Sequence, residues 1–111
     1  MRTSEGNVQV HKPNSPAFDT GTVLVTSQAF GLLQRAGVAP AELLTEHQRL
    51  IPAKAIPTDL ALRLNAIQLR HRVTTRFPVL TLTPQIQITE VCVVTEPGHH
   101  QTLIRLANEF R

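Results

Sequence analysis

The sequence changes character near residue 72, and this change limits the folds that are open to the chain. Before it, apolar residues recur three or four positions apart, as they do on one face of a helix. From Arg72 to Thr95 the chain is rich in Val, Ile and Thr and contains no Gly, and around Phe77 and Val79 its residues alternate. A period of two is typical of a strand with one face in water. The sequence therefore predicts an α+β fold, with helices first and an antiparallel β-meander after them.

Helices are predicted over residues 28–36, 40–49 and 59–71. Gly37 follows the first as a C-terminal stop. Pro40 begins the second at the first helical position, where its missing N–H costs nothing. Two to three N-terminal helices are thus expected to pack on the sheet.

The third predicted helix, residues 59–71, has the most regular apolar pattern. Its stripe at helical spacing consists of Leu60, Leu64, Ile67 and His71. Arg63 and Arg70 lie seven residues apart, which places them together on the outer face. We therefore expect this helix to turn its stripe toward the core and both arginines toward solvent.

Three strands are predicted after the helices, and one short strand before them. They cover residues 22–25, 72–81, 86–95 and 103–110. The first joins the sheet only if it finds a partner, so three to four strands are expected. Pro78 predicts an edge strand or a bulge at this point, because proline donates no ladder hydrogen bond. The run Val91–Val94 is apolar on both faces, which predicts a central strand.

Length and composition indicate one globular domain. The chain has 111 residues, of which 41% are hydrophobic and 17% charged. Residues 1–17 are polar and show no apolar period, so we expect a disordered tail followed by a single domain over residues 18–111. We see no signal peptide and no apolar run near the ~20 residues needed to cross a bilayer. A cytoplasmic protein without membrane contact is expected, and the lone Cys92 fits a reduced core position there.

The local concentration of positive charge is the strongest candidate binding feature. The chain carries a net charge of +3, and basic residues gather around the boundary between the helical and β parts. They are Arg63, Arg70, His71, Arg72 and Arg76. If they converge, they could hold phosphates or another acidic partner. The simpler interpretation is that these residues are solvated side chains on the exposed faces of a helix and a strand. We favour it because no aromatic side chains accompany them on which bases could stack.

No catalytic or metal-binding constellation is found in the sequence. Cys92 lies in an apolar strand with no evident base, so its thiol is expected to be inert. His99 and His100 are interpreted as a solvated turn, because no Cys or carboxylate has ligand spacing around them. There is no Gly-rich phosphate loop. We therefore expect no cofactor and no metal, and a protein without enzymatic activity is favoured over an enzyme.

Two groups of short motifs carry a resemblance to a known family. The first runs from Val25-Thr26-Ser27 through Leu33–Gly37 and Pro40–Leu44 to Glu46–Arg49; the second comprises Arg72–Phe77, Val91–Glu96, Gln101–Ile104 and Glu109-Phe110. Over residues 22–110 the chain resembles small bacterial proteins of unknown function encoded by plasmids and genomic islands, some of them labelled as restriction-system subunits. The resemblance implies an α+β order and an origin in a mobile element, and it implies no activity.

Two functions from different classes follow. The first is a non-enzymatic accessory or regulatory protein of a bacterial mobile element, which binds a protein or nucleic-acid partner through a sheet face or edge. A dimer formed through a sheet edge is compatible with it. The alternative is a ribonuclease of the RelE/ParE toxin type, since helices followed by a meander are similar to that fold. Its candidate charge stabilisers and proton carriers are Arg70, His71, Arg72, Arg76 and Arg105.

Overall fold

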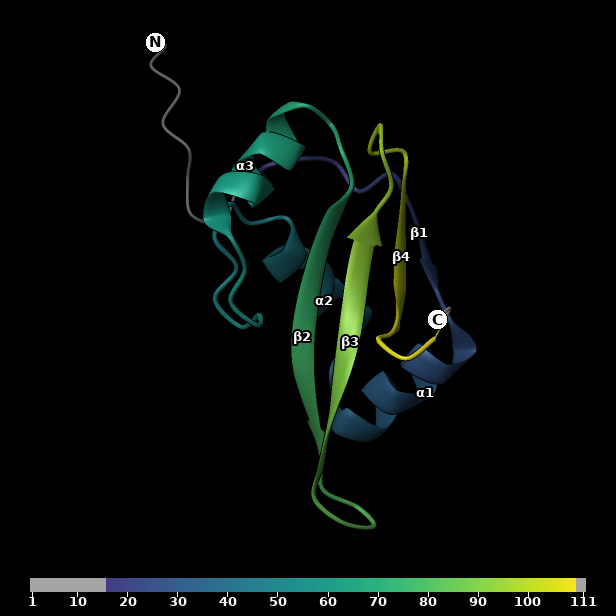
Figure 1. The fold of residues 1–111 in the computed structure, drawn as a ribbon. Coiled ribbons are helices and arrows are strands. Elements are labelled where there is room, and N and C mark those ends of the chain that lie inside the picture. The colour runs from purple at the N-terminus through teal and green to yellow at the C-terminus, as the bar shows by residue number, and fades with distance from the viewer. Residues whose placement is uncertain (1–15, 110–111) are drawn as a thin grey trace, which may run out of the picture.

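The computed structural model describes residues 16–109, which form a four-stranded sheet and three helices (Figure 1). The elements are β1 (Thr22–Val25), α1 (Ser27–Ala36), α2 (Pro40–His47), α3 (Leu60–Gln68), β2 (Val73–Thr81), β3 (Gln87–Thr95) and β4 (Gln101–Leu106). The predicted α+β order is confirmed, although several ends differ by a few residues. Residues 1–15 of the predicted tail lie outside the described residues.

The sheet is mixed, with the strand order β1-β4-β3-β2. β2, β3 and β4 form the predicted antiparallel meander, and β3 is internal, as expected. β1, however, runs parallel to β4, with Thr22 beside Gln101 and Val25 beside Ile104. The prediction of a purely antiparallel sheet is therefore wrong. The partner of β1 is the last strand of the chain, and hydrophobic periodicity does not encode so distant a pairing.

A glycine permits the close approach that starts this parallel pair. The N–H of Thr22 donates to the carbonyl of His100 at 3.0 Å. Gly21, just before it, has a φ of +64°, and a Cβ built there would lie 2.1 Å from the His100 oxygen. Any side chain at this position would push β1 away from the segment that leads into β4.

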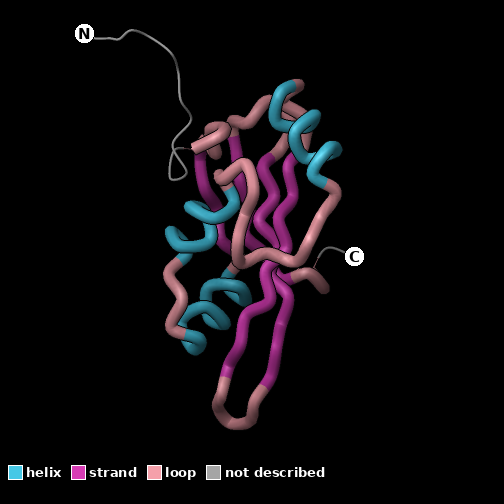
Figure 2. Tube along the Cα trace, turned by 90° about the vertical axis from the view of Figure 1, so that its left-hand side faces the viewer, coloured by secondary structure: helices cyan, strands magenta, loops and turns pink. Residues whose placement is uncertain are grey.

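α1 and α2 cover one face of the sheet, and Figure 2 shows both on the same side of the strands. Thr26 caps α1 by accepting a hydrogen bond from the Ala29 N–H at 3.1 Å, and Gly37 ends it with a φ of 72°. The main core is assembled from α1, α2, β2, β3 and β4. Its buried residues are Ala29, Leu32, Leu33, Leu43, Phe77, Val79, Val91, Val93 and Ile104.

α3 lies beside β2 at the end of the sheet that is remote from the β2–β3 turn (Figures 1 and 2). Its buried side chain is Arg63, which is 5% exposed, whereas Leu60 and Leu62 are 41% and 68% exposed. The prediction that Arg63 shares an outer face with Arg70 is therefore wrong. The helix covers an edge and not a face, so its apolar stripe is only partly buried, and the long Arg63 side chain reaches inward.

β2 is an edge strand, which is one of the two possibilities that Pro78 predicts. The Glu90 carbonyl faces β4, because it accepts from the Ala107 N–H at 3.0 Å. The alternation along β3 and its register with β2 then turn the backbone N–H and C=O of Arg76 outward. The Arg76 carbonyl does accept an outside hydrogen bond, from the Ile56 N–H at 2.7 Å. Pro78 has the same outward orientation, so its missing N–H breaks no hydrogen bond to β3.

Candidate functional site

The five residues predicted as a basic patch do not lie on one surface. Arg63 is buried, whereas Arg70 is exposed and donates from Nη2 to the Gly98 carbonyl at 2.6 Å. His71 is exposed, and its backbone carbonyl accepts a hydrogen bond from His99 Nε2. His99 is only 2% exposed, so the expected solvated turn is wrong for this histidine.

The remaining two arginines lie on the sheet face opposite α1 and α2, and each is paired with an acid. Arg72 contacts Glu96 at 3.1 Å and Arg76 contacts Glu90 at 3.7 Å. Arg105 lies on the same face, and its Nη1 donates to backbone carbonyls near the end of β4. These arginines therefore lie among carboxylates and carbonyls on the sheet face.

The interior contains a chain of polar side chains that was not predicted from the sequence. Arg63 Nη1 is 3.0 Å from Thr75 Oγ1, which is 2.7 Å from His47 Nδ1. His47 Nε2 is 2.8 Å from Thr95 Oγ1, and Thr95 Oγ1 is 2.7 Å from Thr102 Oγ1. The sequence signal was weak: threonines at inward positions of strands, and a histidine on the apolar side of a helix.

Counting donors and acceptors determines the direction of each hydrogen bond between Arg63 and Thr102. The Thr102 hydroxyl donates to the Thr20 carbonyl, so Thr95 must donate to Thr102. Thr95 can then only accept from His47, which places the imidazole proton on Nε2. The unprotonated Nδ1 accepts from the Thr75 hydroxyl, and Thr75 accepts from Arg63. All these hydrogen bonds therefore point the same way, from the buried cation of Arg63 to the backbone carbonyl of Thr20.

His47 is held in the neutral form by these surroundings. Burial, then the charge of Arg63 and then His99, lowers the pKa of His47 from 6.5 to about 3. A second ring proton would also face Thr75, which already receives a hydrogen bond from Arg63. The ring of Phe18 packs edge-on against His47 with the ring centroids 5.1 Å apart. His47 is therefore expected to act as a fixed structural link and not as an acid or base near neutral pH.

Arg63 is a buried cation that has no carboxylate partner among the described residues. Its Nη2 donates to the carbonyls of His47 and Arg49, and its Nε donates to that of Leu50 at 3.2 Å. These oxygens stand at the C-terminus of α2, where the helix dipole is negative. Burial nevertheless lowers the pKa of Arg63 to about 10, so the guanidinium stays charged at neutral pH.

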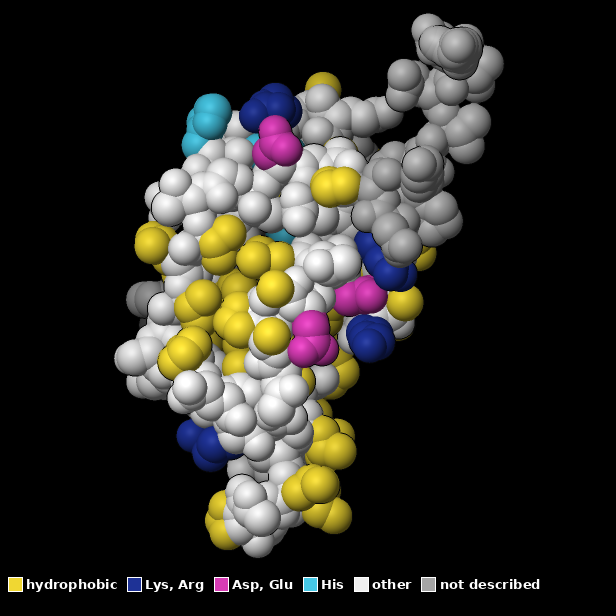
Figure 3. Space-filling view, turned by 180° about the vertical axis from the view of Figure 1, so that it is seen from behind, with side chains coloured by type: hydrophobic (Ala, Val, Ile, Leu, Met, Phe, Trp, Pro, Cys, Tyr) yellow, Lys and Arg dark blue, Asp and Glu magenta, His cyan; other side chains and the backbone are white. Residues whose placement is uncertain are grey.

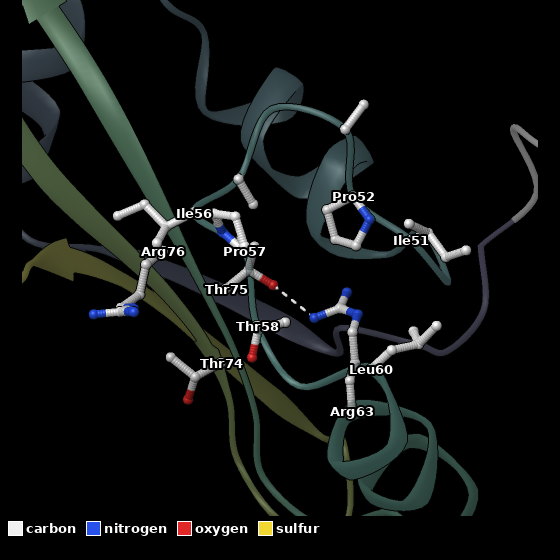
Figure 4. Close-up of a pocket in the computed structure, with 12 residues that line it drawn as sticks. Ile51, Pro52, Ile56, Pro57, Thr58, Leu60, Arg63, Thr74, Thr75 and Arg76 are labelled. Atoms are coloured by element: carbon white, nitrogen blue, oxygen red, sulfur yellow. Dashed lines mark hydrogen bonds between the residues drawn. The ribbon is translucent and has the colours of Figure 1, made fainter.

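A pocket of about 430 Å³ opens beside Arg63, between the loop after α2, the start of α3 and the edge of β2. Figure 4 shows Arg63 reaching into it from α3, with the hydrogen bond to Thr75 on one side. Apolar walls come from Ile51, Pro52, Ala53, Ala55, Ile56, Pro57 and Leu60. The side chain of Arg76 points away from Arg63 (Figure 4). Within residues 16–109, no Asp or Glu lines this pocket.

A second exposed feature is the end of the β2–β3 hairpin, which we call the hairpin arm and define as residues 79–89. β4 pairs with β3 only from Val91 to Thr95, so the arm has no third strand among the described residues. The arm extends past α1 and α2 in Figure 2, and apolar side chains project from it at the bottom of Figure 3. Its large exposed side chains are Leu80, Leu82, Ile86 and Ile88, which are 50%, 63%, 76% and 68% exposed.

The thiol of Cys92, the one cysteine of the sequence, lies beside a carboxylate. Cys92 is buried, as predicted, and burial is the main cause that raises the pKa of its thiol. The Cys92 Sγ lies 4.0 Å from a carboxylate oxygen of Glu90. Residues 16–109 contain no group of three or more His, Cys, Asp or Glu side chains placed to hold a metal ion. They also contain no helix long and apolar enough to span a membrane.

Comparison with protein-family models, with curated proteins and with solved structures found no match to this chain.

Proposed function

We propose that this chain is a non-enzymatic binding protein whose partner is another protein, docked through the hairpin arm. One observation carries the proposal: four large aliphatic side chains project from an arm to which the described residues add no third strand. Soluble chains rarely leave such a cluster exposed without a use for it. The accessory role in a bacterial mobile element that the sequence resemblance implies is part of this proposal.

The chemistry of the arm favours a protein partner over a nucleic acid. Residues 79–89 contain no charged residue, whereas nucleic-acid binding relies on Lys and Arg near phosphates. The arginines Arg72 and Arg76 lie on the open sheet face and are offset there by Glu96 and Glu90. The expected partner presents an apolar groove or cleft that accepts Leu82 and Ile86.

The test compares two doubly substituted proteins. Leu82→Glu with Ile86→Glu places charge on the apolar surface, while Gln85→Glu with Gln87→Glu adds the same charge beside it. A photo-crosslinker at Thr83 identifies the partner in the source cells, and binding of the purified partner is then measured by calorimetry. The first pair should weaken binding at least about tenfold, and the second should leave it nearly unchanged.

Three outcomes would contradict this function. Equal effects of the two variant pairs would show that charge alone, and not the apolar surface, decides binding. Concentration-dependent association in sedimentation that only the first pair abolishes would identify a second copy as the occupant. Binding to neutral lipid vesicles that the first pair abolishes would assign the arm to a membrane surface.

The RelE/ParE-type ribonuclease is the second candidate, because three helices precede the antiparallel unit β2–β3–β4. The proposed charge stabilisers are spread over a turn and the open sheet face, which does not favour a single catalytic centre. Induction of the chain in bacteria, with growth and transcript integrity followed together, distinguishes the two functions. Growth arrest with cleaved transcripts would favour the ribonuclease.

A further inference from the structure

The pocket beside Arg63 combines a cation with an apolar wall, and no acid of the described chain lines it. Arg63 has five N–H donors, and four of them reach Leu50, His47, Arg49 and Thr75. One Nη1 hydrogen is left without an acceptor among the described residues. A buried charge that lacks a counter-ion is costly, so an anion placed against it would gain more than at the protein surface.

The open edge of β2 supplies further donors to the same pocket. Thr74 and Arg76 line it, and their backbone N–H groups point outward from the sheet, because they share the alternation that turns the Arg76 carbonyl toward Ile56. The described residues provide these two groups with no hydrogen-bond acceptor. The hydroxyl of Thr58, at the start of α3, stands at the same rim.

We propose that this pocket binds a carboxylate attached to a small apolar group. The remaining Arg63 hydrogen and the β2 edge amides would hold the carboxylate, and the walls formed by Ile51, Pro52 and Leu60 would bury the apolar part. The volume lies within the range of small-ligand sites, which are mainly apolar with a few placed polar groups. This inference concerns a different surface from the hairpin arm and stands independently of it.

A carboxylate fits these walls better than a phosphate. Seven of the twelve lining residues are apolar, and only one hydrogen of the Arg63 guanidinium remains without an acceptor among the described residues. A phosphate dianion carries more charge and needs more hydrogen-bond donors than the pocket offers. The free energy of its lost hydration would therefore not be offset. A singly charged carboxylate needs two or three donors and leaves room for an aliphatic body.

Two sources supply this chemistry: a free organic acid, and the C-terminal residue of a peptide lying along the edge of β2. The probes are therefore hexanoate and N-acetyl-Ala-Leu, each beside its neutral primary amide, with inorganic phosphate as a third anion. Binding is followed by proton–nitrogen NMR of the backbone amides and of the Arg63 Nε–H. Either acid should shift the signals of Thr74, Arg76 and Arg63, with an affinity at least about tenfold higher than that of its amide.

Two matched variants locate the site without disturbing Arg63. Leu60→Glu puts a carboxylate at the rim of the pocket, and Leu62→Glu places the same charge on the same helix turn outside it. We expect Leu60→Glu to abolish binding of the acid and Leu62→Glu to preserve it. Binding of hexanoate alone assigns a free acid, and binding of the dipeptide alone assigns a peptide terminus.

The proposal is overturned by any of four results. These are no shift with either acid, equal affinity of acid and amide, tighter binding of phosphate, and equal effects of Leu60→Glu and Leu62→Glu. The hairpin-arm variants Leu82→Glu with Ile86→Glu should bind the acid like the unmodified chain. Failure of one proposal therefore leaves the other testable.

Discussion

The guanidinium of Arg63 and the hydroxyl of Thr75 are 3.0 Å apart in the interior, and this contact joins α3 to the edge strand of the sheet. The Thr75 hydroxyl in turn donates a hydrogen bond to His47, at the end of α2. One long side chain thus connects three elements that are separate in sequence. The core near α3 depends on directed hydrogen bonds more than on apolar packing, because the leucines of α3 are partly exposed.

Replacing this arginine should cost far more stability than replacing an exposed one. Arg63→Lys keeps the charge but loses the planar fork, so several carbonyls at the end of α2 lose their donors. We expect a loss of about 2–4 kcal/mol in the free energy of unfolding, measured by urea denaturation. Arg35→Lys, on the exposed side of α1, should change it by less than about 0.5 kcal/mol. Similar losses for both would show that the buried hydrogen bonds add nothing.

The neutral state of His47 makes stability depend on pH in a defined direction. Its pKa is lowered from 6.5 to about 3 in the folded protein, so below pH 6.5 the unfolded chain binds a proton that the folded chain does not. The contribution of the neutral His47 to stability is fully present above about pH 6.5. Below it, the free energy of unfolding falls by about 1.4 kcal/mol per pH unit down to about pH 3. At pH 5 the expected loss is about 2 kcal/mol. Arg63 and His99 face this ring, and both oppose its protonation.

The measurement is urea unfolding from pH 7.5 to pH 4, with ring nitrogen shifts read by NMR. His47 should remain protonated on Nε2 alone across this range. A His47→Gln protein should show a flatter pH profile, whereas His100→Gln, at an exposed position, should keep the original slope. Titration of His47 above pH 5 would contradict the direction of the hydrogen bonds from Arg63 to Thr102.

Pro78 protects the β2 edge, and its removal should promote association. Pro78→Val adds an outward N–H to the edge strand, which has no further strand beside it among the described residues. We expect sedimentation to show concentration-dependent self-association that the unmodified chain lacks at the same concentration. Leu80→Val introduces the same β-branched residue two positions along without adding a donor, and it should behave like the unmodified chain. Equal behaviour of both variants would mean that the proline does not guard this edge.

Much of the local structure followed from the sequence because its causes are local. Gly37 and Pro40 set helix ends through dihedral angles and hydrogen bonds within a few residues of themselves. Pro78 limited its strand to an edge or a bulge for the same reason, since a missing N–H is a property of one residue. The apolar run from Val91 to Val94 predicted an internal strand, and β3 does lie between β4 and β2 with all four of these side chains buried.

The candidate sites were predicted from the sequence much less well than the local structure. Arg63 and Arg70 were paired by helical spacing, but spacing does not say which side of α3 meets the protein. The side that faces inward was decided by the end of α2, whose carbonyls lie within reach of a long basic side chain. The pocket beside Arg63 could not be anticipated either, because its walls come from a loop, a helix and a strand edge that meet only in three dimensions.

The sequence by itself determined the order of helices and strands, the helix ends at Gly37 and Pro40 and the antiparallel meander, because each rests on residues that are neighbours along the chain. Only the tertiary structure decided that β1 lies parallel to β4, that Arg63 is buried while nearby leucines are exposed, and that β4 stops short of the hairpin arm. These outcomes depend on which distant surfaces meet. The helical half and the β half, which divide near Arg72, are therefore joined by β1 and by Arg63.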